Sequence, residues 1–150
     1  MSEWLEVASS EGIDPALRLP PALKELLEAL VRAGYPEETC GLLLGRQAEG
    51  TVEVLDLKQA RNLNRERARD RYELDPADFL AADQAARDRG HQIVGIWHSH
   101  PDHPARPSAN DRARAWAGWS YLIVSVTPDG VRELRSWRLN DGDFIEEVLE

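Results

Sequence analysis

The sequence has only one cysteine, Cys40, among its 150 residues. It therefore cannot form an intramolecular disulfide or build a zinc site from clustered cysteines, so any metal ligands must come from histidine and carboxylate side chains. Long apolar runs are also lacking, since no stretch approaches the roughly 20 residues that span a bilayer. Residues 1–6 carry acids where a secretory signal would have an apolar core. We therefore expect a cytoplasmic protein with no membrane partner.

Positive charge is in short supply, because 18 Lys and Arg residues face 27 Asp and Glu residues and the formal charge is −9. Such a chain is repelled by phosphate backbones, so we expect no nucleic-acid partner, although adaptation to salt would give the same acidic balance. With 42% hydrophobic and 30% charged residues, the composition is that of a globular protein. The length predicts one domain over 1–150, with the polar stretch 1–14 as a loosely held N-terminal arm.

Apolar periodicity and turn residues predict a mixture of helices and strands after this arm, of the α/β (α+β) class. One helix begins at Pro20-Pro21 and a second at Asp75-Pro76, and each ends at a glycine. The first helix is expected to bury an apolar stripe of Leu23, Leu26, Leu27, Leu30 and Val31. The expected strands are 17–19, 41–46, 51–57, 72–74, 93–97, 120–126, 131–137 and 144–149, and the expected helices are 21–34, 76–89 and 109–117.

Two histidines, His98 and His100, directly follow the apolar strand expected at 93–97. Because alternate side chains of a strand share a face, the two imidazoles would lie side by side while Ser99 points the other way. A lone histidine on an apolar strand is more often a satisfied core residue. Two histidines on one face, at the strand's exit and before a proline-rich turn that begins at Pro101, favour a shared metal ion.

Ser108 and Asp111 lie at the start of the short helix expected next. Their Ser-x-x-Asp spacing is that of a capping box, in which each side chain binds a backbone amide of the other residue. The alternative is that the carboxylate returns to the histidines as a third metal ligand. Two histidines and one carboxylate leave a fourth tetrahedral position for water, as in catalytic zinc sites. Both roles can hold at once.

Two other segments also have alternative interpretations. Glu38 precedes a short apolar strand, either as a solvated turn residue, which this stretch alone favours, or as a base held at a site. The segment 61–71 has five arginines and few apolar residues, so its composition favours a mobile solvated loop. Its functional alternative is a docking surface for an acidic or C-terminal segment of a partner. Cys40 has no basic neighbour in sequence, which predicts a buried residue rather than a thiol nucleophile.

With ETCGLLLG from Glu38, HSHP from His98 and SxxD from Ser108, the chain resembles the JAMM (MPN+) metallopeptidases over nearly its whole length. The resemblance implies a fold similar to cytidine deaminases, with a curved mixed β-sheet flanked by helices. It implies one zinc ion bound by His98, His100 and Asp111. It also implies that Glu38 is the general acid/base acting through the zinc-bound water, and that Ser108 stabilises the tetrahedral intermediate.

The same resemblance implies a substrate class. Members of the family cut after the C-terminal Gly-Gly of ubiquitin-like proteins, and the short connection after Asp111 lacks the insertion of polyubiquitin enzymes. The chain thus looks like the compact prokaryotic members that act on ubiquitin-fold sulfur carrier proteins, including those that release cysteine during its biosynthesis. We expect the Gly-Gly tail to add a strand beside the site, and the carrier to dock on Arg65, Arg67 and Arg69. The oligomeric state is left open.

Three rival classes share part of this pattern. A non-catalytic MPN module that serves as an assembly scaffold usually lacks the metal ligands, which are all present here. A RadC-like domain carries a related His-x-His-Pro run but is associated with DNA, which the acidic charge opposes. A nucleoside deaminase has a similar fold but needs a Pro-Cys-x-x-Cys motif, which a single cysteine cannot supply.

Overall fold

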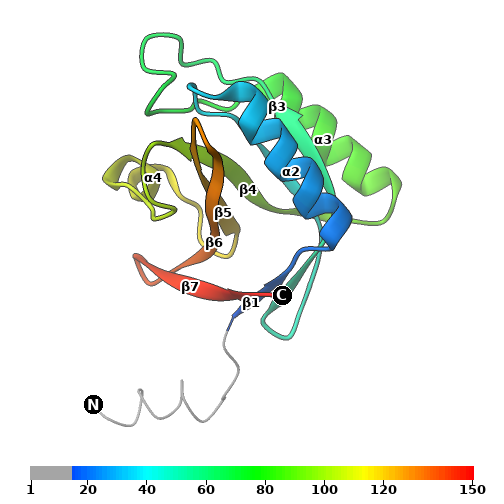
Figure 1. Cartoon of the computed structure of the whole chain (residues 1–150). Helices are drawn as coiled ribbons and strands as arrows, with labels where there is room; N and C mark the ends of the chain where they lie inside the picture. The colour runs from blue at the N-terminus through cyan, green and yellow to red at the C-terminus, as the bar shows by residue number, and fades with distance from the viewer. Residues whose placement is uncertain (1–14) are drawn as a thin grey trace, which may run out of the picture.

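The computed structural model describes residues 15–150, so the arm expected at 1–14 lies outside the described residues. This part of the chain contains both strands and helices, which confirms the mixed α+β class (Figure 1). The elements are β1 (Ala16–Arg18), α2 (Pro21–Gly34), β2 (Cys40–Ala48), β3 (Thr51–Ala60), α3 (Pro76–Asp88), β4 (Gln92–Pro101), α4 (Ala109–Arg114), β5 (Ser120–Thr127), β6 (Gly130–Asn140) and β7 (Asp143–Leu149). Among the described helices, none has the length and apolarity needed to cross a membrane.

The strands form one mixed sheet in the order β1-β3-β2-β4-β5-β6-β7, as the resemblance implied. The sheet closes into a barrel because β1 pairs in parallel with both β3 and β7. The β4–β5 pair is also parallel, and its crossover carries α4. All other neighbours are antiparallel, including the last three strands. Closure depends on only three residues of β1, which overlaps the strand expected at 17–19, although the sequence did not indicate that this strand pairs on both sides.

The two long helices cover opposite faces of the sheet around β2. Leu43 of β2 packs with Leu27 and Val31 of α2 in the larger core, which also holds Trp97. Its neighbour Leu42 packs in a second cluster with the small residues of α3. Because β2 is buried on both faces, its first part is a continuous apolar run rather than an alternating one.

Glycine is required at position 41 by a close approach inside the larger core. The indole nitrogen of Trp97 on β4 reaches across β2 and donates a hydrogen bond to the backbone oxygen of Lys58 at 3.2 Å. A Cβ atom at Gly41 would lie 2.1 Å from that oxygen and 2.4 Å from the indole nitrogen. Glycine at position 41 therefore leaves room for the hydrogen bond that links β4 to β3 across β2, at the end of the sheet where the histidines lie.

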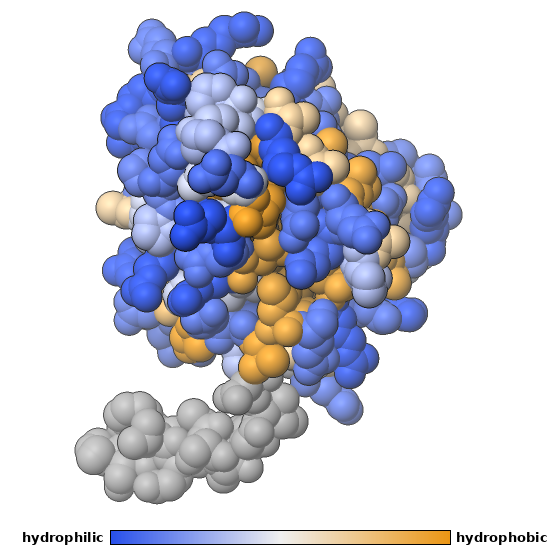
Figure 2. Space-filling view, in the orientation of Figure 1, coloured by the Kyte–Doolittle hydropathy of each residue, from blue (hydrophilic) through white to orange (hydrophobic). Residues whose placement is uncertain are grey.

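The structure corrects several local expectations. Strict alternation from Val52 and Val54 would place Leu57 on the opposite face of β3, but the ladder between β2 and β3 shifts register beside Leu44 and Leu57 joins their core. Leu26 of α2, expected in the core, is 43% exposed. The strand expected at 72–74 is only a bridge between Asn62 and Leu74, and the helix expected at 109–117 ends at Arg114. Figure 2 shows an apolar band between hydrophilic surfaces on the face seen in Figure 1.

Candidate metal centre and active site

The C-terminal end of β4 places His98 and His100 on one face of the sheet, as strand periodicity predicts. Their ring centroids lie 4.9 Å apart. His98 is completely buried and His100 is 7% exposed. β4 is central at this point, because His98 pairs with Cys40 of β2 on one side and with Ile123 of β5 on the other. The imidazoles are therefore held on a rigid part of the barrel.

Asp111 in the first turn of α4 joins these histidines while it also caps its own helix. The capping box is complete, since the Asp111 amide donates to Ser108 Oγ at 3.0 Å and the Ser108 amide donates to Asp111 Oδ2 at 2.8 Å. The same carboxylate has Oδ2 3.2 Å from His100 Nε2 and Oδ1 3.7 Å from His98 Nε2. The interpretation as a capping box is therefore confirmed, and the cap turns the carboxylate towards the imidazoles, where it could serve as a third ligand.

Glu38 lies on the opposite side of His98 from Asp111. Its Oε1 atom is 3.5 Å from His98 Nδ1, and the residue is only 6% exposed. The interpretation as a solvated turn residue is therefore wrong. Backbone hydrogen bonds hold Glu38 in place, because its amide donates to Ala68 O and its carbonyl accepts from the Asn62 side chain. Both partners lie in or beside the arginine-rich segment, which is thus bonded to the site despite its low apolar content.

This cluster fits a metal ion on an observation independent of the motif. His98, His100 and Asp111 each offer one ligand atom, and these atoms lie within 4.8 Å of one another. Both nitrogens of His98 and the Oε1 atom of Glu38 are buried without a hydrogen-bond partner. Buried polar atoms are rarely left unpaired, so such a group calls for a ligand that the protein itself does not supply. Two imidazoles and one carboxylate are a donor set of catalytic zinc sites.

Hydrogen bonding selects the ligand atom of His100. Its Nδ1 atom lies 2.9 Å from the backbone oxygen of Pro104. A carbonyl can only accept, so Nδ1 carries a hydrogen and Nε2 faces Asp111. Burial alone would lower the pKa of His100, but the hydrogen bonds to Asp111 and Pro104 outweigh it and raise that pKa. Burial would likewise raise the pKa of Asp111, but the two histidines and Ser108 lower it to about 2.

Two nearby residues were missed by reasoning from the sequence. The ring of Tyr72 stacks on His98 with centroids 4.5 Å apart, and burial raises the pKa of its hydroxyl well above the ordinary value. Asn62 binds Glu38 O and Arg71 O through its side-chain amide, which ties the two ends of the arginine-rich segment to the site. Asn62 lies near the start of that segment and Tyr72 directly follows it, and the only signal in the sequence was that both differ in residue type from the arginines around them.

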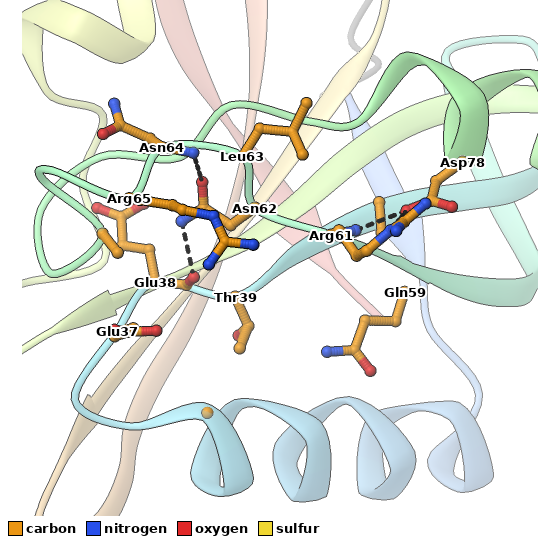
Figure 3. A pocket seen from close by; sticks show the side chains of 13 residues that line it. Glu37, Glu38, Thr39, Gln59, Arg61, Asn62, Leu63, Asn64, Arg65 and Asp78 are labelled. Atoms are coloured by element: carbon orange, nitrogen blue, oxygen red, sulfur yellow. Dashed lines mark hydrogen bonds and ion pairs between the residues drawn. The ribbon is translucent and has the colours of Figure 1, made fainter.

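Two hollows meet at Glu38. One, of about 780 Å³, runs past the end of β3 and is lined by Glu38, Asn62 and Arg65 among others. Figure 3 shows Arg65 and Glu38 at the same end of this hollow. The other, of about 380 Å³, is lined by Glu38, Ser108 and Arg67 together with His100. The carboxylate can therefore be reached by a substrate even though little of it is exposed.

The three arginines of the expected docking surface are exposed, but they do not form one cluster. Arg65 lines the larger hollow and Arg67 the smaller one, where Arg67 is paired with Asp70. Arg69 lines a third hollow beside Asp102, and Arg67 lines this hollow as well. Arg67 and Arg69 therefore share one hollow, and Arg65 lines another.

Comparison with known proteins gives one consistent result. Residues 20–140 match the prokaryotic homologs of the JAB domain. The chain belongs to this prokaryotic JAB family. It is 39% identical to a desampylase of Haloferax volcanii over 114 residues, which cover 75% of this chain and 76% of that protein. It is 32% identical to the CysO-cysteine peptidase of Mycobacterium tuberculosis over 129 residues, with 83% and 86% covered.

The fold agrees with this membership. The solution structure of a protein from Desulfitobacterium hafniense superposes on this JAB domain with a TM-score of 0.79 and 32% identity, covering 89% of this chain and 91% of the other. The JAMM resemblance predicted from the motifs is therefore confirmed, and the chain is a hydrolase of the JAMM peptidase type.

Proposed function

We propose that this JAB domain is a zinc-dependent peptidase that cuts the peptide or isopeptide bond after the C-terminal Gly-Gly of a ubiquitin-fold sulfur carrier protein. The observation that carries the proposal is the buried Glu38 carboxylate, placed 3.5 Å from an imidazole of the His98, His100 and Asp111 cluster. The names of the related desampylase and CysO-cysteine peptidase support a substrate of this class.

The cluster would hold the zinc ion, and Glu38 would move the proton. His98, His100 and Asp111 would hold the ion, which would supply Lewis acidity and a lowered pKa of nearby water. Glu38 takes a proton from the attacking water and passes it to the leaving amine, a role worth roughly 10²- to 10⁴-fold in rate. Its burial supports this role, because a buried carboxylate facing a cavity keeps its proton transfers away from bulk solvent.

Ser108 is positioned to assist at the developing oxyanion. Its Oγ atom already accepts the Asp111 amide, so its own hydrogen remains free to be donated. The residue is exposed and lines the smaller hollow together with Glu38 and His100. A hydroxyl donated to the oxyanion stabilises the tetrahedral intermediate. The same residue would thus orient a ligand and contact the substrate.

The carrier would enter through the larger hollow. β3 has its outer edge paired by β1 only at Thr51–Glu53, so the rest of that edge, up to the residues that line the hollow, can accept an added strand. An extended Gly-Gly tail needs a path without bulky side chains and would lie along this edge to Glu38. Arg65, Arg67 and Arg69 around the entrance are proposed to contact the folded part of the carrier.

The first experiment measures zinc content and cleavage of a carrier-Gly-Gly-cysteine adduct by mass spectrometry. A parallel substrate joins the carrier to a lysine side chain of a second protein. Glu38→Gln should retain one zinc per chain and lose cleavage. Glu25→Gln is the matched control, since Glu25 is exposed on α2, lines neither of the hollows at Glu38 and should keep full activity. No zinc in the native chain, or equal activity of the two variants, would contradict the proposal.

The docking surface has its own test. Replacing Arg65, Arg67 and Arg69 with Ser should raise the KM for the carrier adduct and leave zinc content and kcat near those of the native chain. Arg46, Arg87 and Arg89, which are exposed and line none of the three hollows, offer a control triple for the same loss of positive charge. An unchanged KM in the triple variant would remove these arginines from the proposal.

A further inference from the structure

The turn after β4 is held by two side chains of β6. Ala105 lies in the irregular stretch between β4 and α4, yet it is completely buried. Glu133 Oε2 accepts a hydrogen bond from the Ala105 amide at 3.1 Å. Trp137 Nε1 donates to the Ala105 carbonyl at 3.0 Å. Glu133 and Trp137 are four residues apart on one strand, so their side chains share a face. Together they bind both the backbone amide and the backbone carbonyl of Ala105.

One of these bonds continues directly to the metal cluster. The Ala105 amide and the Pro104 carbonyl belong to the same peptide group, which is planar and places its N–H and C=O on opposite sides. Glu133 binds the N–H side of this group, and His100 Nδ1 binds the C=O side at 2.9 Å. The direction of the Pro104 oxygen is therefore set by Glu133.

We infer that Glu133 and Trp137 are positioning residues that aim the Nε2 atom of His100 at the metal position. Glu133 acts through the 104–105 peptide group, and Trp137 holds the adjoining peptide group through the Ala105 carbonyl. Prolines at 104 and 107 leave this turn with few amides for backbone pairing, so side chains from β6 replace a regular ladder. Glu133 is itself held, because its Oε1 atom accepts from Arg135 at 3.1 Å. The inference rests on the proposed zinc site.

Glu133 also acts through its charge. Hydrogen bonds in a chain polarise one another, and an ionised acceptor on the N–H side makes the carbonyl on the other side a stronger acceptor. A stronger acceptor at Nδ1 makes Nε2 of His100 more basic and a better metal ligand. The bond from the Ala105 amide lowers the pKa of Glu133, so the carboxylate stays charged at neutral pH.

Three substitutions separate these effects. Glu133→Ala removes the acceptor, Glu133→Gln keeps an oxygen acceptor without the charge, and Trp137→Phe removes only the N–H donor. The zinc dissociation constant, measured by competition with a chromogenic chelator, should rise about tenfold in Glu133→Ala and Trp137→Phe. Glu133→Gln should bind zinc more tightly than Glu133→Ala. With Co²⁺ in place of zinc, Glu133→Ala and Trp137→Phe should also shift the visible absorption bands of the site.

Matched controls distinguish positioning from packing. Glu146→Ala removes another carboxylate that pairs with Arg135, and Trp119→Phe changes a half-buried tryptophan in the other core cluster. Both should bind zinc as the native chain does. Native zinc affinity in Glu133→Ala and Trp137→Phe would overturn the inference while leaving the proposed peptidase intact. Equal losses in the controls would overturn it as well, because they would indicate a general effect on stability.

Discussion

Ser99 and Thr39 exchange two hydrogen bonds that join β4 to the residue after Glu38. The Ser99 amide donates to the Thr39 carbonyl at 2.9 Å, and the Thr39 amide donates to Ser99 Oγ, also at 2.9 Å. Ser99 is fully buried between the two histidines and points away from them. The strand that carries the proposed metal ligands is therefore tied to the segment that carries the proposed base.

This link predicts a kinetic effect of Ser99→Ala. The variant leaves the buried Thr39 amide without its acceptor and loosens Glu38 relative to His98, so kcat should fall about 10- to 100-fold, as misplacement of a reacting group does. Zinc content should not change, because both imidazoles remain. Steady-state kinetics with metal analysis checks this, and Ser99→Thr, which keeps the hydroxyl, should restore much of the rate. A fully active Ser99→Ala would contradict the positioning role.

Ser108 has two roles that substitution can separate. Ser108→Ala should lose about 1 kcal/mol of stability with the helix cap and about 10²- to 10³-fold in kcat with the oxyanion donor. Ser108→Gly should cost only a few tenths of a kcal/mol in stability, since glycine is tolerated at caps, and should lose the same factor in kcat. Denaturant unfolding and kinetics measure the two quantities. If kcat fell in Ser108→Ala but hardly in Ser108→Gly, in parallel with stability, Ser108 would act only as a helix cap.

The pair of Asp111 and His100 predicts a pH dependence of the metal-free protein. The raised pKa of His100 stabilises the fold fully below its ordinary value of 6.5, and this contribution is lost as pH rises through the raised pKa. The lowered pKa of Asp111 contributes above its ordinary value of 3.8 and is lost as pH falls through about 2. The contribution of the pair is therefore largest between 3.8 and 6.5.

The measurement compares Tm of the native chain and Asp111→Asn with a chelator present. Asparagine keeps the cap but removes the charge, so the difference in Tm should be larger at about pH 5.5 than at about pH 9. A difference that does not change between these pH values would show that the ion pair does not contribute to stability. Zinc uptake should increase as pH rises through the pKa of His100, because the metal must displace the His100 proton.

Cys40 is expected to be chemically inert. Burial, followed by the nearby Glu38 carboxylate, raises the pKa of its thiol to about 12. The thiolate is the reactive form, so iodoacetamide should not modify Cys40 in the folded protein at neutral pH but should do so after unfolding. Mass spectrometry detects the adduct. Rapid modification of Cys40 in the native chain, or loss of cleavage when Cys40 is modified, would contradict this expectation and indicate a functional thiol.

Much of the candidate site follows from local patterns. Two histidines at strand spacing must share a face, and Ser-x-x-Asp at a helix start forms a cap whatever surrounds it. These geometries depend on residues within a few positions of one another, so the sequence by itself determined that His98 and His100 lie together and that Ser108 binds Asp111. The long apolar runs likewise determined β2 and β5, because only buried strands tolerate them.

Other features depend on which distant segments pack together. The local sequence of Glu38 favoured a solvated residue, but distant residues, among them Asn62, Ala68 and His98, surround it in the folded chain. Tyr72 stacks on His98, which lies 26 positions later in the chain. Trp137 donates a hydrogen bond to Ala105, which lies 32 positions earlier. Closure of the barrel by three residues of β1 is of the same kind. Such contacts have no local signal, since the partner is chosen by packing of the whole sheet, and so only the tertiary structure decided them.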